Sequence, residues 1–520
     1  MTAGRIAPRT AALATVLGVL FLTFLDTTIV SVTLGDIESD IGAGVIPLQW
    51  VINAYALVFA SLMLIGGSLS DRFGRKRLMI VGVAIFTVGS VMCALAPDIG
   101  VVIAGRAVMG LGAAACEPGT LSVIRQLYPE RATRARALGA WSAVSGLALA
   151  LGPVVGGLLV GAGSWRWVFW FNLVVAVLLL VAVAVFVPES RDPQPGRLDF
   201  AGFVLGVAGL GCVIFAAISG EYQGFGTPWI VALFVVGGLC LVAFGPVESR
   251  VRNPMLNLSH LRKPIVGSAL FAAFAVYFGV FAIFFFTALY LDIGLNYSGL
   301  KLAEMFAPMA AAIVVGGLAS GRWVARAGTR WPTVAGCALG AVGMLLARVE
   351  LNRGASFTFW LLSLALALAG IGFGITVVPL TSAVLSHVPG RHSGMAASAT
   401  NTARQLGAVV GVAALGAVIN VHLKAGVDKA VGGLGGLGGP GLRKQVIGFI
   451  ETGGSGGFDI NSFPAPLKKP FVDEFLGGLQ LALLVAVVLI VLAGIVAALV
   501  REPTPEPDIE ATADAAVKAA

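Results

Sequence analysis

The stretch Gly67-Ser-Leu-Ser-Asp-Arg-Phe-Gly-Arg-Lys-Arg77 lies between two long apolar runs. It places one acid, four bases and two glycines in a connection too short to form a domain. The stretch therefore predicts a tight charged turn between two membrane helices. Its carboxylate can accept hydrogen bonds from the N-terminus of a neighbouring helix or pair with an arginine, and its glycines allow backbones to approach closely. We predict that the turn latches one helical bundle to another through Gly67, Asp71, Arg72, Gly74 and Arg75; the alternative is an ordinary basic cytoplasmic loop.

Composition places the whole chain in a membrane. Of its 520 residues, 58% are hydrophobic and 12% are charged, and the mean hydropathy is +0.94. A soluble domain has about 25% charged residues. The net charge of +8 does not indicate a nucleic-acid partner, because the bases fall in short loops on one side of the predicted membrane. The positive-inside rule then places the N- and C-termini in the cytoplasm.

Three classes of site find no support in the sequence. The five cysteines lie inside apolar runs and predict no disulfide framework. The four histidines are scattered without the spacing of metal ligands. No Gly-x4-Gly-Lys-Ser/Thr loop is present. We therefore expect no metal, no cofactor, no enzymatic activity and no nucleotide-driven transport.

Apolar runs of about 20 residues predict fourteen membrane spans, arranged as six, two and six. The predicted units are a six-helix bundle over 1–187, a linker with two extra spans over 188–264, and a second six-helix bundle over 265–500. A long outer segment over 421–476 is either a flexible connector or, near Lys468, Lys469, Asp473 and Glu474, a helical extension. The tail over 501–520 is predicted to be disordered.

An internal repeat supports the division into two halves. Gly321, Arg326 and Gly328 follow Gly67, Arg72 and Gly74 at a constant sequence offset, but Ala325 stands where the first copy has Asp71. A latch made by the carboxylate is therefore expected in the first half only. Parallel halves of this kind place a binding site at the midplane between them.

Four charges lie inside predicted spans, at Asp26, Arg106, Glu117 and Arg404. Each costs about 2.5–3.5 kcal/mol to insert unless it is paired or hydrated. Asp26 and Arg106 lie at similar depths, so they form either a proton carrier with its modulator or a fixed ion pair. Glu117 is deeper, without an obvious partner, and binds a proton or cation or else has a packing role. Arg404 is the main embedded charge of the second half, and this scarcity of charge favours apolar substrates.

The fifth span carries closely spaced glycines and a proline, namely Gly146, Gly152, Pro153, Gly156 and Gly157. Glycines at this spacing predict a flat helix face for close packing, and the proline removes one backbone donor.

Several stretches resemble one transporter family, the fourteen-helix drug:proton antiporters of the major facilitator superfamily. These are the charged turn, the glycine stretch of the fifth span, Leu25-Asp26-Thr27-Thr28-Ile29-Val30, Arg106-x2-Met109-Gly110 and Asn401-x2-Arg404-Gln405. The resemblance implies an all-α facilitator fold and export of amphipathic or apolar organic compounds against protons by alternating access. It implies Asp26 as proton carrier, Arg106 as its modulator, and the glycine stretch as a mark of antiport. Ser31 and Met109 depart from the family pattern.

The expected partners are small molecules, protons and membrane lipids, and the expected location is a bacterial-type plasma membrane. We expect a monomer. Two other functions remain open on the same fold. One is dedicated export of a lipid or secondary metabolite, and the other is a membrane receptor that transports nothing.

Overall fold

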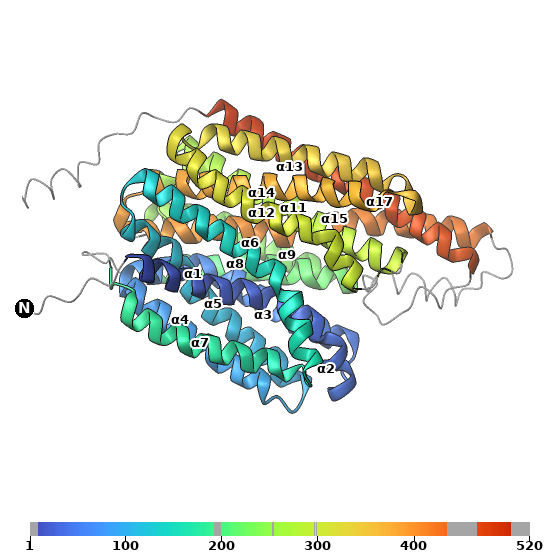
Figure 1. Ribbon diagram of the computed structural model, residues 1–520, viewed down its shortest axis with the longest axis horizontal. Coiled ribbons are helices and arrows are strands. Elements are labelled where there is room, and N and C mark those ends of the chain that lie inside the picture. The colour runs from blue at the N-terminus through green and yellow to red at the C-terminus, as the bar shows by residue number, and fades with distance from the viewer. Residues whose placement is uncertain are drawn as a thin grey trace, which may run out of the picture.

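Fourteen helices of the described chain are long and apolar enough to cross a membrane, as predicted. The computed structural model describes residues 9–191, 199–251, 254–295, 297, 299–433 and 465–500. The regular secondary structure of these residues is helical, and short turns and loops connect the helices (Figure 1). The first six spans form one bundle, which we call the N-half. They are α1 (Arg9–Ile29), continued by η1 (Val30–Thr33) and α2 (Leu34–Ile41), then α3 (Val45–Phe73), α4 (Arg75–Ala94), α5 (Ile99–Leu127), α6 (Arg131–Gly161) and α7 (Arg166–Phe186).

The last six spans form a second bundle, the C-half. They are α11 (Pro264–Leu289) with η2 (Tyr290–Gly294), α12 (Gly299–Ala327), α13 (Arg330–Leu351), α14 (Phe359–His387), α15 (Ser393–Gly433) and α17 (Ala465–Leu499). Short turns at η3 (Gly354–Ser356) and η4 (Gly390–His392) precede α14 and α15. We call the end of the molecule where α3 passes into α4 the Asp71 end.

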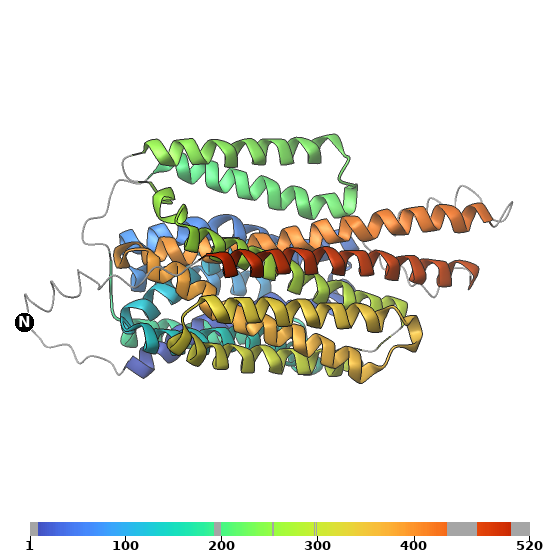
Figure 2. The same ribbon diagram turned by 90° about the horizontal axis from the view of Figure 1, so that it is seen from above.

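The two extra spans, α8 (Phe200–Gln223) and α9 (Pro228–Arg250), lie side by side next to the main body, followed by the short α10 (Leu258–Leu261) (Figure 2). Helix α8 contacts both α3 of the N-half and α15 of the C-half. A small apolar cluster of Ala60, Leu210, Ile214 and Ile218 joins them, with Leu406 and Val409 packed against it. The extra pair therefore covers a line along which the two halves meet.

Helices α15 and α17 project beyond the other spans at the end opposite Asp71 (Figure 2). Helix α15 has 41 residues and is about 60 Å long at 1.5 Å per residue, twice the roughly 30 Å of a hydrocarbon core. The outer segment predicted over 421–476 is therefore helical at both ends, over 421–433 and 465–476. Its centre, 434–464, and the tail 501–520 lie outside the described residues.

The halves meet along a seam where α6 packs on α12 and α14, and α15 packs on α3 and α5. Small residues make this approach possible. A Cβ atom added at Gly67 would lie 2.1 Å from the carbonyl oxygen of Gly394, and one at Gly321 would lie 2.7 Å from that of Ala135. Backbone atoms cannot move aside as a side chain can, so the seam requires these glycines.

The glycine stretch of α6 packs on two different neighbours. A Cβ at Gly152 or Gly156 would collide with α1, at 1.9 Å from Thr28 Oγ1 and 2.7 Å from the Ile29 carbonyl oxygen. Gly146 faces α12 across the seam. A Cβ at Gly157 would meet nothing within 4 Å, so the predicted flat face does not include this residue. Helix α6 continues through Pro153 to Gly161.

Gly156→Ala and Gly157→Ala form a matched test of this packing. We expect Gly156→Ala to lower the melting temperature of the detergent-purified protein, because overpacking typically costs about 1–3 kcal/mol. Gly157→Ala should melt like the wild type, because its added methyl group points into open space. Equal melting temperatures for both variants, measured by fluorescence-detected size exclusion after heating, would contradict the packing of α6 on α1.

Candidate functional site

The charged turn ties the two halves together at the Asp71 end. The Asp71 carboxylate accepts hydrogen bonds from the backbone N–H groups of Gly394 and Met395, at 2.9 and 3.0 Å. Both N–H groups belong to the first turn of α15, which begins at Ser393, and N–H groups there carry partial positive charge. The Arg75 guanidinium donates to the same carboxylate at 2.8 Å and to the carbonyl of Gly390 at 3.2 Å. Both side chains are buried, so α3 holds the start of α15 through a water-poor polar contact.

Gly74 and Arg72 of the turn have other neighbours than Asp71 and Arg75. Gly74 has φ +108°, a conformation that favours glycine, and a Cβ there would lie 2.7 Å from the Glu189 carboxylate. That carboxylate accepts from the N–H groups of Lys76 and Arg77 and so caps α4. Arg72 lies over the ring of Phe73, with its Cζ 5.4 Å from the ring centre.

Asp26 and Arg106 meet inside the N-half. Arg106 Nη1 donates to Asp26 Oδ2, and Asn172 Nδ2 donates to Asp26 Oδ1 at 2.7 Å. Arg106 Nε donates to the Val51 carbonyl at 2.9 Å, and its guanidinium lies over the Tyr55 ring, 4.5 Å from the centre. Asp26 and Arg106 are completely buried. The geometry is that of an ion pair, and its contacts join α1, α3, α5 and α7.

Glu117 lies at the seam, and the prediction that it lacks a partner was wrong. Asn401 Nδ2 of α15 donates to Glu117 Oε1 at 3.2 Å, across the two halves. The predicted depth of Glu117 in its own span could not identify this partner, because Asn401 belongs to the other half. Among the described residues, Glu117 Oε2 has no hydrogen-bond partner, and the side chain is buried. Asn401 lies eight residues into α15, about 12 Å from its start at the Asp71 end.

Arg404 lies on the same face of α15 as Asn401, three residues further on. Its Nη1 donates to Asn401 Oδ1 at 3.0 Å, so Asn401 links the arginine to Glu117. Its Nη2 donates to Thr381 Oγ1 and to the Val377 carbonyl, the latter at 3.3 Å. The seam thus holds a continuous polar chain from α5 through α15 to α14.

Residues that we did not predict as partners complete these sites. Asn172 is the amide of an otherwise apolar stretch of α7, and Asn401 precedes Arg404 by one helical turn, so both could have been predicted as partners from residue type and spacing. Nothing in the sequence singles out Trp141 as a partner. Its Nε1 donates at 3.1 Å to Thr120 Oγ1, which donates at 2.6 Å to the carbonyl of Glu117. Trp141 therefore supports the backbone at Glu117 from α6.

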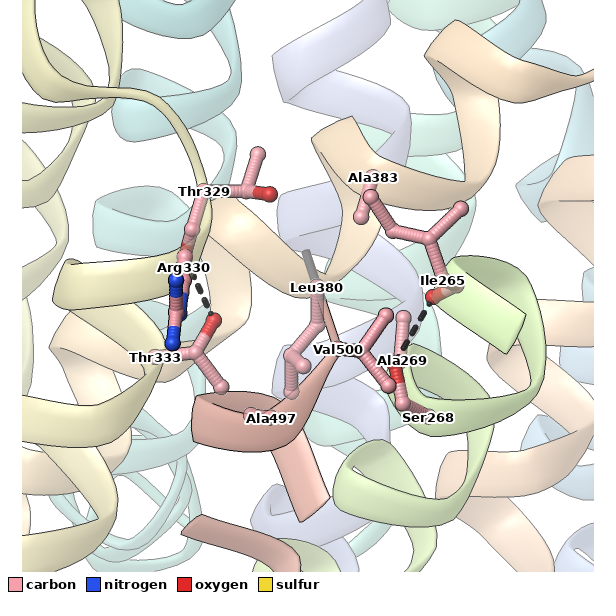
Figure 3. A pocket seen from close by; sticks show the side chains of 10 residues that line it. All are labelled: Ile265, Ser268, Ala269, Thr329, Arg330, Thr333, Leu380, Ala383, Ala497 and Val500. Atoms are coloured by element: carbon pink, nitrogen blue, oxygen red, sulfur yellow. Dashed lines mark hydrogen bonds between the residues drawn. The ribbon is translucent and has the colours of Figure 1, made fainter. Parts of the chain in front are cut away.

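A separate small pocket lies within the C-half at the Asp71 end, between α11, α13, α14 and α17 (Figure 3). Two of its hydroxyl groups bond to carbonyl groups of the preceding helical turn: Thr333 Oγ1 donates to the Thr329 carbonyl at 2.8 Å and Ser268 Oγ to that of Ile265 at 3.0 Å. Arg330 Nη2 donates to the Ala498 carbonyl. The pocket lies away from the seam and is not part of the chain at Glu117.

Comparison with known proteins identifies the family. Residues 16–412 match the Major Facilitator Superfamily. The chain belongs to the major facilitator superfamily. This is a family of transporters, and the fourteen membrane-capable helices make this facilitator a multi-pass protein of the inner membrane.

Two relatives have names that describe resistance. The facilitator is 32% identical over 416 residues to the multidrug resistance protein Stp of Mycobacterium tuberculosis, covering 80% of this chain and 76% of Stp. It is 35% identical over 408 residues to the puromycin resistance protein pur8 of Streptomyces alboniger, covering 78% and 81%. The crystal structure of the human organic anion transporter MFSD10 (TETRAN) matches with a TM-score of 0.59 and 15% identity, covering 92% of this chain and 99% of that one. This last likeness shows the fold.

The burial of Asp26 and Arg106 predicts how their substitution changes the stability of this facilitator. Asp26→Asn leaves Arg106 buried without an anion, and Arg106→Gln leaves Asp26 without a cation, which typically costs about 3–5 kcal/mol. We expect each single variant to lower the melting temperature and the yield of folded protein. The double variant should recover most of the loss, because no unpaired charge remains. A double variant no better than the worse single variant would contradict a fixed ion pair.

Proposed function

We propose that this facilitator exports amphipathic organic compounds in exchange for protons, by alternating access. The observation that carries the proposal is the contact between Glu117 of the N-half and Asn401 of the C-half, in which one carboxyl oxygen keeps no partner among the described residues. An ionised carboxylate inside a membrane is costly unless a cation or several donors meet it. Glu117 has one neutral donor, so a bound proton removes that cost.

The protonation state of Glu117 can control whether the two halves stay in contact at the seam. When Glu117 is neutral, it accepts a single hydrogen bond from Asn401, and the halves hold each other. When it ionises, the carboxylate needs more hydrogen-bond donors than the single Asn401 amide, and a separation of the halves admits water to it. Loss of the proton and opening of the seam are therefore coupled in this proposal.

The Asp71 latch supplies the second element. Its two hydrogen bonds to the start of α15 close the Asp71 end, which the positive-inside rule places in the cytoplasm. Opening that end toward the cytoplasm requires both bonds to break. Because the second copy of the turn has Ala325 in place of the acid, only the N-half supplies a carboxylate to the latch.

Asp26 and Arg106 take a supporting role in this scheme. Every described polar contact of the pair lies inside the N-half, so separation of the halves leaves it intact. We therefore assign proton coupling to Glu117 and assign to the pair the packing of α1, α3, α5 and α7. The names of Stp and pur8 support drugs and antibiotics as the exported class.

A second candidate is dedicated export of a lipid or secondary metabolite. The observation that favours it is the projection of α15 and α17 beyond the membrane-length spans (Figure 2). Such a projection offers a surface for passing cargo on.

The coupling is tested by dye export in energised inverted vesicles, using cationic, neutral and anionic fluorescent amphiphiles. We expect wild-type export of at least one dye to collapse with an uncoupler. Glu117→Gln should lose uphill export yet keep exchange of dye for dye, because a glutamine oxygen still accepts from Asn401 but carries no proton.

Glu38→Gln is the matched control, since Glu38 is exposed, and it should export like the wild type. Uphill export by Glu117→Gln at the wild-type rate would show that Glu117 is not the proton carrier. If wild-type vesicles with a verified gradient move none of the dyes, the multidrug hypothesis fails and the dedicated-cargo candidate replaces it.

The latch is tested with Ser398→Cys in a background without the native cysteines, because Ser398 faces Gly67 and is buried. Asp71→Asn loses the ion pair with Arg75 and one of the two backbone hydrogen bonds. We expect it to raise labelling of the introduced cysteine by a membrane-impermeant maleimide from the Asp71 end. Asp98→Asn, at a helix start on the opposite end, should leave labelling low. Unchanged labelling in Asp71→Asn would show that the turn does not close this end.

A further inference from the structure

Arg404 is a buried arginine whose described hydrogen-bond partners are all neutral. Its side chain, 2% exposed, donates to Asn401, Thr381 and the Val377 carbonyl. Among the described residues no carboxylate forms an ion pair with it, and its Nε, also buried, has no hydrogen-bond partner. Its hydrogen-bond link to Glu117 runs through Asn401, and the two groups are close enough to interact electrostatically. The seam therefore holds a positive charge and an unused donor inside the membrane, a costly arrangement that usually marks function.

Two aromatic rings flank this guanidinium, one from each half. Its Cζ lies 5.2 Å from the ring centre of Trp141 on α6 and 5.6 Å from that of Tyr277 on α11. Further rings continue the surface on both sides, with Phe24 6.2 Å from Trp141 and Phe373 4.9 Å from Tyr277. Rings placed over a guanidinium show that the space beside it suits a flat π-system.

The ring of Trp141 belongs to the N-half and Arg404 to the C-half. A separation of α6 from α15 therefore removes one ring and uncovers the guanidinium, with Tyr277 still in place. A flat aromatic ligand can then occupy the position of the Trp141 ring. An oxygen atom of this ligand can then accept hydrogen bonds from the planar guanidinium of Arg404, which favours anionic or strongly accepting oxygens.

We propose that Arg404, between Trp141 and Tyr277, recognises flat aromatic compounds that carry an anionic or strongly hydrogen-bond-accepting oxygen. This inference rests on the proposed export function and specifies its substrate class. It sharpens the expectation of apolar substrates, because a lone arginine repels cationic aromatics and attracts phenolates and quinone-like oxygens. The chain to Glu117 gives the ligand a second effect. An oxygen that takes the Nη1 donor of Arg404 displaces Asn401, the residue that holds Glu117.

The test uses two flat three-ring dyes of similar size and opposite charge, anionic resorufin and cationic proflavine. Binding to the purified full-length protein is followed by fluorescence polarisation, and transport is followed in proteoliposomes with an imposed proton gradient. We expect the wild type to bind and move resorufin in preference to proflavine. Arg404→Gln should lose resorufin binding by about tenfold or more, as for loss of a charged hydrogen bond, and should reverse the preference.

Arg404→Lys keeps the charge and should retain the preference for resorufin with weaker binding. Tyr277→Leu removes the ring that stays beside Arg404 and should weaken binding of both dyes. Arg250→Gln, at an exposed position of α9, should match the wild type. A general loss of structure lowers both dyes together, whereas the inference requires a reversal of charge preference. Equal treatment of the two dyes by the wild type, or an unchanged preference in Arg404→Gln, overturns it.

The two readouts separate this inference from the proposed function. Gradient-driven transport of proflavine without resorufin binding would leave proton-coupled export standing and overturn the role of Arg404. Charge-selective binding of resorufin that depends on Arg404, without gradient-driven transport of any dye, would support the recognition site and contradict the export function.

Discussion

Polar atoms inside a membrane find no water, and this constraint accounts for where each embedded charge of the chain lies. Asp26 and Arg106 satisfy it completely within the N-half, with Asn172 and the Val51 carbonyl as further partners. At the seam, Asp71 and Glu117 instead accept hydrogen bonds from the other half, and one oxygen of Glu117 and the Nε of Arg404 have no partner among the described residues. Transport proteins need such shared contacts, because a contact that lies within one rigid half cannot respond to the movement of the other.

The seam divides into two regions with different chemistry. At the Asp71 end, a carboxylate caps the start of α15, and glycines bring the backbones of α3 and α15 together. Deeper, Asn401 joins Glu117 to Arg404 through its amide, which donates to one and accepts from the other. An amide is suited to this position because its N–H group donates to the carboxyl oxygen of Glu117 while its carbonyl oxygen accepts from the guanidinium of Arg404. Helix α8 of the extra pair packs against both α3 and α15, so a movement of the halves also has to be accommodated there.

The sequence was sufficient for features that depend on local pattern. Hydropathy predicted the fourteen spans, and the geometry of Asp71 and the meeting of Asp26 with Arg106 followed from residue type and depth. Features that depend on tertiary approach were out of reach. The partner of Glu117 comes from another bundle, 284 positions away, and Trp141 is an ordinary aromatic until the fold brings it to Thr120. Gly157 has the same local pattern as Gly156, but only the position of α1 distinguishes them. The helical ends of the 421–476 segment extend past the span because helix formation does not stop at the membrane surface.

The role of Glu117 is decided by the release of protons when an exported compound binds to the purified protein, followed with a pH indicator in weakly buffered detergent solution. We expect the wild type to release protons, and Glu117→Gln to bind the compound and release none. Release by Glu117→Gln equal to that of the wild type would show that the proton is carried elsewhere, and would contradict the assignment of Glu117 as the group that couples the seam to the proton gradient.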